Sequence, residues 1–334
     1  MDMNTLWFIL IGVIFCAFFF LEGFDYGVAI LMPFLARKDA EKRIIRNTIG
    51  PVWDGNEVWM IVAAGAIFAA FPNWYATLFS SFYIFMFIIL LALIVRNVSF
   101  EFRDKLDSPA WKNVWDGAFF VGSLIPAFLW GMIFAGLLAG IPINEKADYA
   151  GSFLDLIKPV TIAGGFMGLL LFTFHGAVFL LLKTEDDLLE KVKKLSAKVG
   201  ISAAAGGVIL MAWLALQGHA FEKFFTGAAS ILALLALMAV NLLLFYKKYG
   251  TAMYISGLSV VMSVAAIFSG LFPNVMISSL DPAFSLDIYN SASSAYSLKV
   301  ISICALTLLP IIIAYQAWTY RVFSQRVNSK NLEY

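Results

Sequence analysis

The sequence has few charged residues and few cysteines, and these shortages exclude several classes of protein. Asp, Glu, Lys and Arg make up 13% of the 334 residues, whereas a soluble domain has about 25%. The two cysteines, Cys16 and Cys304, lie in apolar runs without CxxC or histidine spacing, so neither a disulfide framework nor a zinc site is indicated. A net charge of +1 gives no basic surface for nucleic acid.

Apolar residues are abundant instead. They form 61% of the chain, the mean hydropathy is +0.86, and 32 of the residues are Phe, which excludes a disordered protein. A membrane-spanning helix needs about 20 mostly apolar residues. The sequence therefore predicts an all-α, polytopic membrane protein with one domain over residues 1–334 and nine spans, at 5–35, 54–71, 75–96, 115–140, 158–182, 199–217, 226–246, 253–272 and 298–322.

Basic residues predict the orientation of these spans. Of the 23 Lys and Arg residues, 19 fall in alternate connections and at the C-terminus, on one side of the predicted membrane. Positive residues mark the cytoplasmic side. We therefore expect the N-terminus outside and the C-terminus in the cytoplasm.

Five acidic residues lie within or at the ends of predicted spans. Glu22 and Asp25 are three residues apart in the first span and so share a helix face. Asp25 is about 15 Å from the cytoplasmic end of that helix. Asp54 and Glu57 repeat this spacing at the start of the second span, and Asp116 opens the fourth. A carboxylate at membrane depth is costly unless it is paired, hydrated or protonated, so these acids are candidates for a proton path from the cytoplasm.

Structural roles compete with this interpretation. Asp54, Glu57 and Asp116 occupy first turns, where an acid complements the helix dipole and caps free N–H groups. For Asp25 the competing role is an ion pair. Arg96, at the inner end of the third span, fits either an ordinary interface anchor or a counter-ion for one of the acids.

Histidine is scarce, which argues against a redox centre. His219 lies in a predicted outside loop and is expected to be solvated, so its replacement should not affect activity. His175 lies inside the fifth span, where a lone histidine more often bonds a neighbouring helix carbonyl than a metal. Without HxxxH, CxxCH or a carboxylate–histidine pair, we expect this chain to bind no metal and no cofactor of its own.

Several motifs resemble subunit II of the cytochrome bd-type quinol oxidases. The resemblance covers essentially the whole chain and rests on Gly23–Val28, Trp53–Trp59, Arg96–Arg103, Trp111, Trp115–Asp116 and Ser285–Leu298. It implies a bacterial cytoplasmic membrane complex that oxidises quinol and reduces dioxygen to water. In that family two haems b and one haem d sit in the larger subunit I, and subunit II is a haem-free partner of related fold. Protons for water formation come from the cytoplasm. Membrane lipid, quinone and a small single-span third subunit are further partners that the family allows.

The resemblance also suggests roles for individual residues. Asp25 and Asp54 match acids assigned to the proton route or to haem assembly, and Arg96 and Asp116 match positions tied to stability of the haem region. Glu57 stands where some members have Gln. The neighbouring Trp53, Asn56 and Trp59 are expected to support the site. From the residues alone, a proton-coupled secondary transporter or a purely structural assembly subunit remain alternatives, although transporters usually have central sites in inverted repeats.

Overall fold

The computed structural model describes residues 2–216 and 223–328, so the predicted loop histidine, His219, lies outside the described residues. Within those ranges the chain forms helices and one small antiparallel ribbon of two strands. The helices are α1 (Met3–Leu35), α2 (Asp39–Ile49), α3 (Trp53–Ala70), α4 (Pro72–Ser81), α5 (Tyr83–Phe102), α6 (Pro109–Ala139), α7 (Pro159–Lys183), α8 (Asp186–Leu216), α9 (Phe224–Phe245), α10 (Tyr249–Leu271) and α11 (Ala295–Val322); the strands are β1 (Asn274–Met276) and β2 (Leu286–Asp287).

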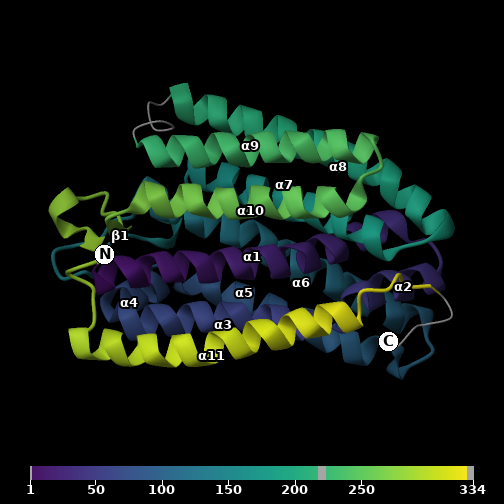
Figure 1. Cartoon of the computed structure of the whole chain (residues 1–334), viewed down its shortest axis with the longest axis horizontal. Helices are drawn as coiled ribbons and strands as arrows, with labels where there is room; N and C mark the ends of the chain where they lie inside the picture. The colour runs from purple at the N-terminus through teal and green to yellow at the C-terminus, as the bar shows by residue number, and fades with distance from the viewer. Residues whose placement is uncertain (1, 217–222, 329–334) are drawn as a thin grey trace.

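The long helices run side by side along one axis, with α1 in the middle of the bundle (Figure 1). In this view α9 and α10 lie on one side of α1, while α3 and α11 lie on the other. The end of the bundle near the N-terminus carries β1, and the opposite end carries α2 and the C-terminal end of α11. The second end is the one that the basic residues predict to be cytoplasmic.

The all-α membrane architecture is confirmed, and eight helices in the described part of the chain are long and apolar enough to cross a membrane. The predicted span at 54–71 is the helix α3, which has 18 residues. It is not among the eight, because its first turns contain Asp54, Asn56 and Glu57 and are therefore polar. The helix of this predicted span is thus present, and its crossing of the membrane stays a prediction.

Three boundaries differ from the sequence prediction. The connection between the first two predicted spans, for which no helix was predicted, contains α2. The predicted span at 75–96 is divided, because α4 ends at Ser81 and α5 begins at Tyr83. The span predicted to start at 199 begins at Asp186, so the lysine-rich stretch before it is a helical extension. Charge alone suggested a loop there, but Lys, Glu and Leu are good helix formers.

The close approach of α1 and α7 depends on two glycines. A Cβ atom on Gly27 would lie 2.1 Å from the carbonyl oxygen of Phe172, and a Cβ on Gly176 would lie 2.5 Å from the main chain of Gly27. Small residues allow membrane helices to pack backbone against backbone in this way. This close contact fixes the position of α1 in the middle of the bundle. The helix α1 carries Glu22 and Asp25.

Candidate functional site: a buried charge cluster

Arg96 is the centre of a buried charge cluster formed by α1, α3 and α5. Its Nη1 lies 2.5 Å from Glu22 Oε1, and its Nη2 donates a hydrogen bond to Glu57 Oε1. The second oxygen of Glu57 accepts a hydrogen bond of 2.7 Å from Asn97 Nδ2. The side chains of Arg96 and Glu22 are fully buried, whereas that of Glu57 is 15% exposed. Arg96 is therefore a counter-ion for two acids rather than an interface anchor.

Neighbouring residues allow Arg96 to occupy this position. A Cβ on Gly122 of α6 would lie 2.8 Å from Arg96 Cβ, so the missing side chain lets α6 pack directly on α5. On another side, the guanidinium carbon lies 5.1 Å from the centre of the Tyr26 ring, which is a cation–π distance. The arginine is thus held by packing as well as by its ion pairs.

A chain of hydrogen bonds ends on Asp25, which is also fully buried. Asn56 Nδ2 donates to Asp25 Oδ2 at 2.7 Å, and Tyr320 Oη donates to Asn56 Oδ1 at 2.7 Å. Gln316 Nε2 donates to the same Asn56 oxygen at 3.2 Å, and Trp59 Nε1 donates to Gln316 Oε1 at 2.6 Å. These hydrogen bonds join α1, α3 and α11, and the series of donors ends at the Asp25 carboxyl group.

The charges of this region do not balance if every acid is ionised. Glu22, Asp25 and Glu57 are three carboxyl groups near the single guanidinium of Arg96. A buried carboxylate without a partner costs several kcal/mol, so low-dielectric surroundings favour a neutral set of groups. Carboxyl groups in such a cluster can be neutralised by taking up protons, which is the chemistry that a proton path needs.

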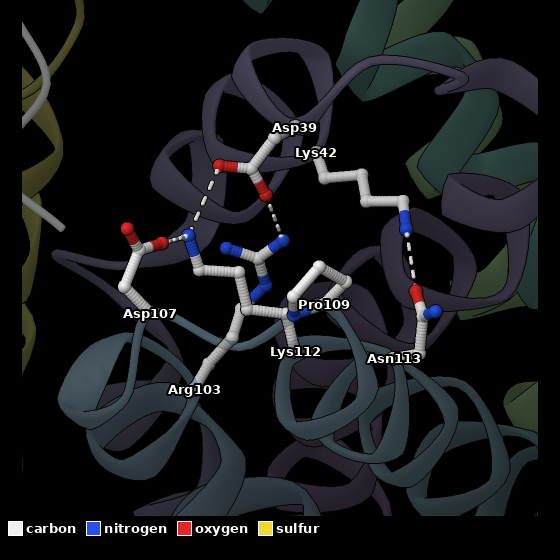
Figure 2. Close-up of a pocket in the computed structure, with 7 residues that line it drawn as sticks. All are labelled: Asp39, Lys42, Arg103, Asp107, Pro109, Lys112 and Asn113. Carbon is white, nitrogen blue, oxygen red and sulfur yellow. Dashed lines mark hydrogen bonds and ion pairs between the residues drawn. The ribbon is translucent and has the colours of Figure 1, made fainter.

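Asp116 belongs to a separate ion network near the predicted cytoplasmic end. Arg103 Nε lies 2.6 Å from Asp116 Oδ1, and Lys42 Nζ lies 2.9 Å from Asp116 Oδ2. Arg103 also binds Asp39 at 2.6 Å. Asp39 and Arg103 line a cavity of about 240 Å³. Figure 2 shows the Lys112 ammonium group between Asp39 and Asp107 at this cavity. The prediction that Asp116 joins the other acids is therefore not what the structure shows; its ion pairs connect α2 to the start of α6.

Asp54, the other acid that the sequence offered beside Asp25 as a proton-path candidate, does not face Asp25. The side chain of Asp54 is exposed, and Asn56 occupies the place against Asp25. Trp53 is half-buried and stacks on Phe100, with ring centres 4.9 Å apart. Asp54 and Trp53 therefore lie beside the buried cluster, whereas Asn56 and Trp59 belong to the hydrogen-bond chain that supports Asp25.

Sequence reasoning missed Tyr320 and Gln316 of α11, Asn97 of α5 and Tyr26 of α1. Asn97 and Tyr26 lie within motifs that the resemblance had singled out. Tyr320 and Gln316 gave only a weak signal, since each is a polar side chain in an otherwise apolar span. Their contact with Asn56 joins residues about 260 positions apart in the chain.

His175 is held between helices by both of its ring nitrogens. Nδ1 lies 2.7 Å from Ser256 Oγ, and Nε2 lies 2.9 Å from the carbonyl oxygen of Phe20. Because a carbonyl only accepts, Nε2 carries the proton and Nδ1 accepts from the serine. Both nitrogens are occupied, so this histidine does not fit an axial haem ligand. The expected bond to a helix carbonyl is confirmed.

A family model and several relatives place this chain in one family, and a solved structure shares its fold. The family model described as cytochrome bd terminal oxidase subunit II matches residues 3–323. A Bacillus subtilis (strain 168) protein named cytochrome bd ubiquinol oxidase subunit 2 is 43% identical, with 98% of each chain covered. The Escherichia coli (strain K12) cytochrome bd-I ubiquinol oxidase subunit 2 is 31% identical, over 99% of this chain and 97% of the relative. A chain in the structure of bd oxidase from Geobacillus thermodenitrificans shares the fold, with a TM-score of 0.61 at 11% identity, over 96% of this chain and 98% of that one.

Proposed function

The chain belongs to the cytochrome bd terminal oxidase subunit II family, and from this premise we propose that it is the haem-free subunit that supports subunit I and lines a proton path from the cytoplasm. Family membership makes it part of an oxidoreductase complex of the bacterial plasma membrane, with quinol as substrate, haem in the complex and a subunit I as partner. The match over nearly the whole chain does not favour the secondary transporter.

The two haems b and the haem d are proposed to reside in subunit I. This is supported by His175, whose ring nitrogens are already bonded to Ser256 and Phe20. Haem in the partner would supply the electron transfer and the dioxygen chemistry. The residues of this chain would hold and move protons. The small third subunit, bound lipid and bound quinone stay expectations from the family resemblance.

We further propose nine crossings in one membrane domain, with the N-terminus outside. The helix α3, with 18 residues, is about 27 Å long, close to the hydrocarbon thickness of about 30 Å. It lies alongside α11 in the bundle (Figure 1). The distribution of basic residues over the two ends supports the direction.

The proton path rests on one observation, the fully buried set of Glu22, Asp25 and Arg96. Asp25 lies about 15 Å from the predicted cytoplasmic end of α1. Glu22 is on the same helix face, one turn deeper, and Arg96 links it to Glu57, which is partly exposed. Protons from the cytoplasm would reach Asp25, pass to Glu22, and leave through Glu57 to the partner subunit. The remaining candidates have supporting roles: Asp54 is a surface acid near the outlet, and Asp116 stabilises the cytoplasmic end.

An optical spectrum tests the oxidase assignment. The complex purified through a tag on this chain should show the reduced band of haem d from its co-purified partner. The chain expressed alone and folded should show no haem bands. A folded, isolated chain with stoichiometric haem would contradict the haem-free assignment, and a tagged chain that purifies without any haem-bearing partner would contradict the oxidase role.

A further inference from the structure

A second cavity, of about 250 Å³, opens at the predicted cytoplasmic end of the bundle. It lies between the connection from α2 to α3, the end of α7 and the end of α11. Its wall includes Val52, Lys183 and Tyr320. A water molecule needs only about 10–15 Å³ of such space together with polar partners, so the cavity has room for several.

Tyr320 connects this cavity to the buried acid of α1. It lines the cavity, and its hydroxyl donates to Asn56 Oδ1, while Asn56 Nδ2 donates to Asp25 Oδ2, each at 2.7 Å. Only two hydrogen bonds therefore separate a cavity-lining side chain from a carboxyl group with no exposed surface. The other oxygen, Asp25 Oδ1, is buried and accepts no hydrogen bond from a donor in the described ranges. Asn56 therefore holds one oxygen of the carboxyl group.

The rim of the cavity is built by the segment after α11. Lys183 Nζ donates to the carbonyl oxygens of Phe323 and Gln325. Arg326 Nη1 donates to the carbonyl of Thr184 at 2.5 Å. These bonds hold residues 323–327 across the end of α7. In each of them, an N–H group of Lys183 or Arg326 donates to a main-chain carbonyl oxygen. Hydrogen bonds to α7 and to the residue after it therefore hold this segment in place at the opening of the cavity.

The first cavity leads elsewhere. It is lined by Asp39 and Arg103 (Figure 2). Arg103 binds both Asp39 and Asp116, and these ion pairs are separate from the hydrogen bonds that lead to Asp25. Of these two cavities, the second is the one that touches the hydrogen-bond chain of the proposed proton path.

We propose that the second cavity is the water-filled entrance through which protons from the cytoplasm reach Asp25, with Tyr320 and Asn56 as positioning residues that connect the cavity wall to the carboxyl group. The inference rests on the proposed role of Asp25. In this step a hydronium ion in the cavity gives up its proton, which passes along further water to the Asp25 carboxylate. The carboxylate becomes a carboxylic acid, and a neutral water molecule stays behind in the cavity. The proton then moves on toward Glu22, which restores the carboxylate.

Chemical blocking of the cavity in the assembled complex tests the entrance. Val52→Cys places a thiol of similar size in the cavity wall. Ala197→Cys, on an exposed position of α8, is the matched control. Each purified complex, together with the unsubstituted parent, is treated with a positively charged methanethiosulfonate reagent. Modification is measured by mass spectrometry, and oxygen consumption per haem d is compared before and after treatment.

We expect modification of Val52→Cys to slow turnover at least tenfold, while quinol still reduces the haems and the haem d band is retained. Modified Ala197→Cys and the treated parent should keep their rates. A fully modified Val52→Cys complex with an unchanged rate would overturn the entrance, as would a Val52→Cys thiol that stays unreactive while Ala197→Cys reacts. In either case a slow Asp25→Asn variant would leave the proposed path standing. If Asp25→Asn instead matches the parent while blocking slows turnover, the proposed role of Asp25 fails.

Discussion

Arg96 Nη1 lies 2.5 Å from Glu22 Oε1, and neither side chain has any exposed surface. Each charge therefore depends on the other, because removal of one partner of a buried pair leaves an uncompensated charge and costs about 3–5 kcal/mol. The pair joins α5 to α1 in the centre of the bundle. Loss of this ion pair should therefore lower the yield of assembled complex more than it lowers the rate of turnover of the complexes that do assemble.

Replacement of the arginine tests this dependence. We expect Arg96→Gln to lower the yield of assembled complex strongly, because it leaves Glu22 buried without a counter-ion. The double variant Glu22→Gln with Arg96→Gln also removes the charge of Glu22, leaving Asp25 and the partly exposed Glu57, and should recover part of the yield. Haem d content per milligram of membrane protein is the measurement. Equal losses in the single and double variants would show that the ion pair is not what makes the arginine necessary.

A second prediction concerns the contact between α1 and α7. Gly27→Ala would place a methyl group against the carbonyl oxygen of Phe172, 2.1 Å from it, and so should force the helices apart. We expect a fall in the thermal unfolding midpoint of the complex. Gly250→Ala, in the first turn of α10, is the control: no atom of another element lies within 4 Å of the added carbon, so the change should be neutral or slightly stabilising. Similar midpoints for both variants would contradict the close-packing account.

Most helices were predictable from the sequence, because a long apolar run predicts a membrane-spanning helix and basic residues in a connection predict the cytoplasmic side. The helix α2 and the first part of α8 were not, because their charged residues resemble those of a loop. Their helical state depends partly on contacts between them: Glu41 of α2 accepts a hydrogen bond of 2.5 Å from Lys191 of α8. The break at Phe82 between α4 and α5 had no Gly or Pro signal.

The candidate site was predictable only in part. The spacing of Glu22 and Asp25 placed both on one face of α1, and both are buried as expected. The choice between Asp54 and Asn56 as the neighbour of Asp25 could not be made, since residues two apart on a helix point in different directions. The donors from α11 could not be found because no local pattern connects positions so distant in the chain.

A third prediction uses His175. Because its two hydrogen bonds join α7 to α1 and α10, His175→Ala should destabilise the complex by about 1–3 kcal/mol. The haem content of the molecules that do assemble should be unchanged. The test is the ratio of haem to protein in purified complex, together with its unfolding midpoint. An assembled variant that lacks one haem equivalent would show that the histidine is a ligand.

The fourth prediction concerns pH and Glu41. Partial burial opposes its ionisation, but hydrogen bonds from Lys191 and from the main-chain N–H groups of Arg37 and Lys38 outweigh this and lower the pKa of Glu41 to about 2. A lowered pKa stabilises the folded state above the ordinary value of 4.5, and this contribution is lost as the pH falls from there toward 2. Glu41→Gln should therefore be less stable than the parent at pH 7, with the difference shrinking in acid. A difference in unfolding midpoint that stays constant from pH 7 to acid would contradict the assignment.

The role of Asp25 is the central claim, and turnover per haem d in Asp25→Asn tests it most directly. The amide keeps the shape of the side chain but cannot release a proton. We predict that oxygen consumption per haem d falls at least tenfold while quinol still reduces the haems, and that Asp25→Glu retains partial activity. Expressing the rate per haem d separates turnover from assembly, since a purely structural acid would lower the amount of complex and leave the rate of the assembled fraction unchanged. Turnover of Asp25→Asn at the parental rate per haem d would contradict the account and place the proton route elsewhere.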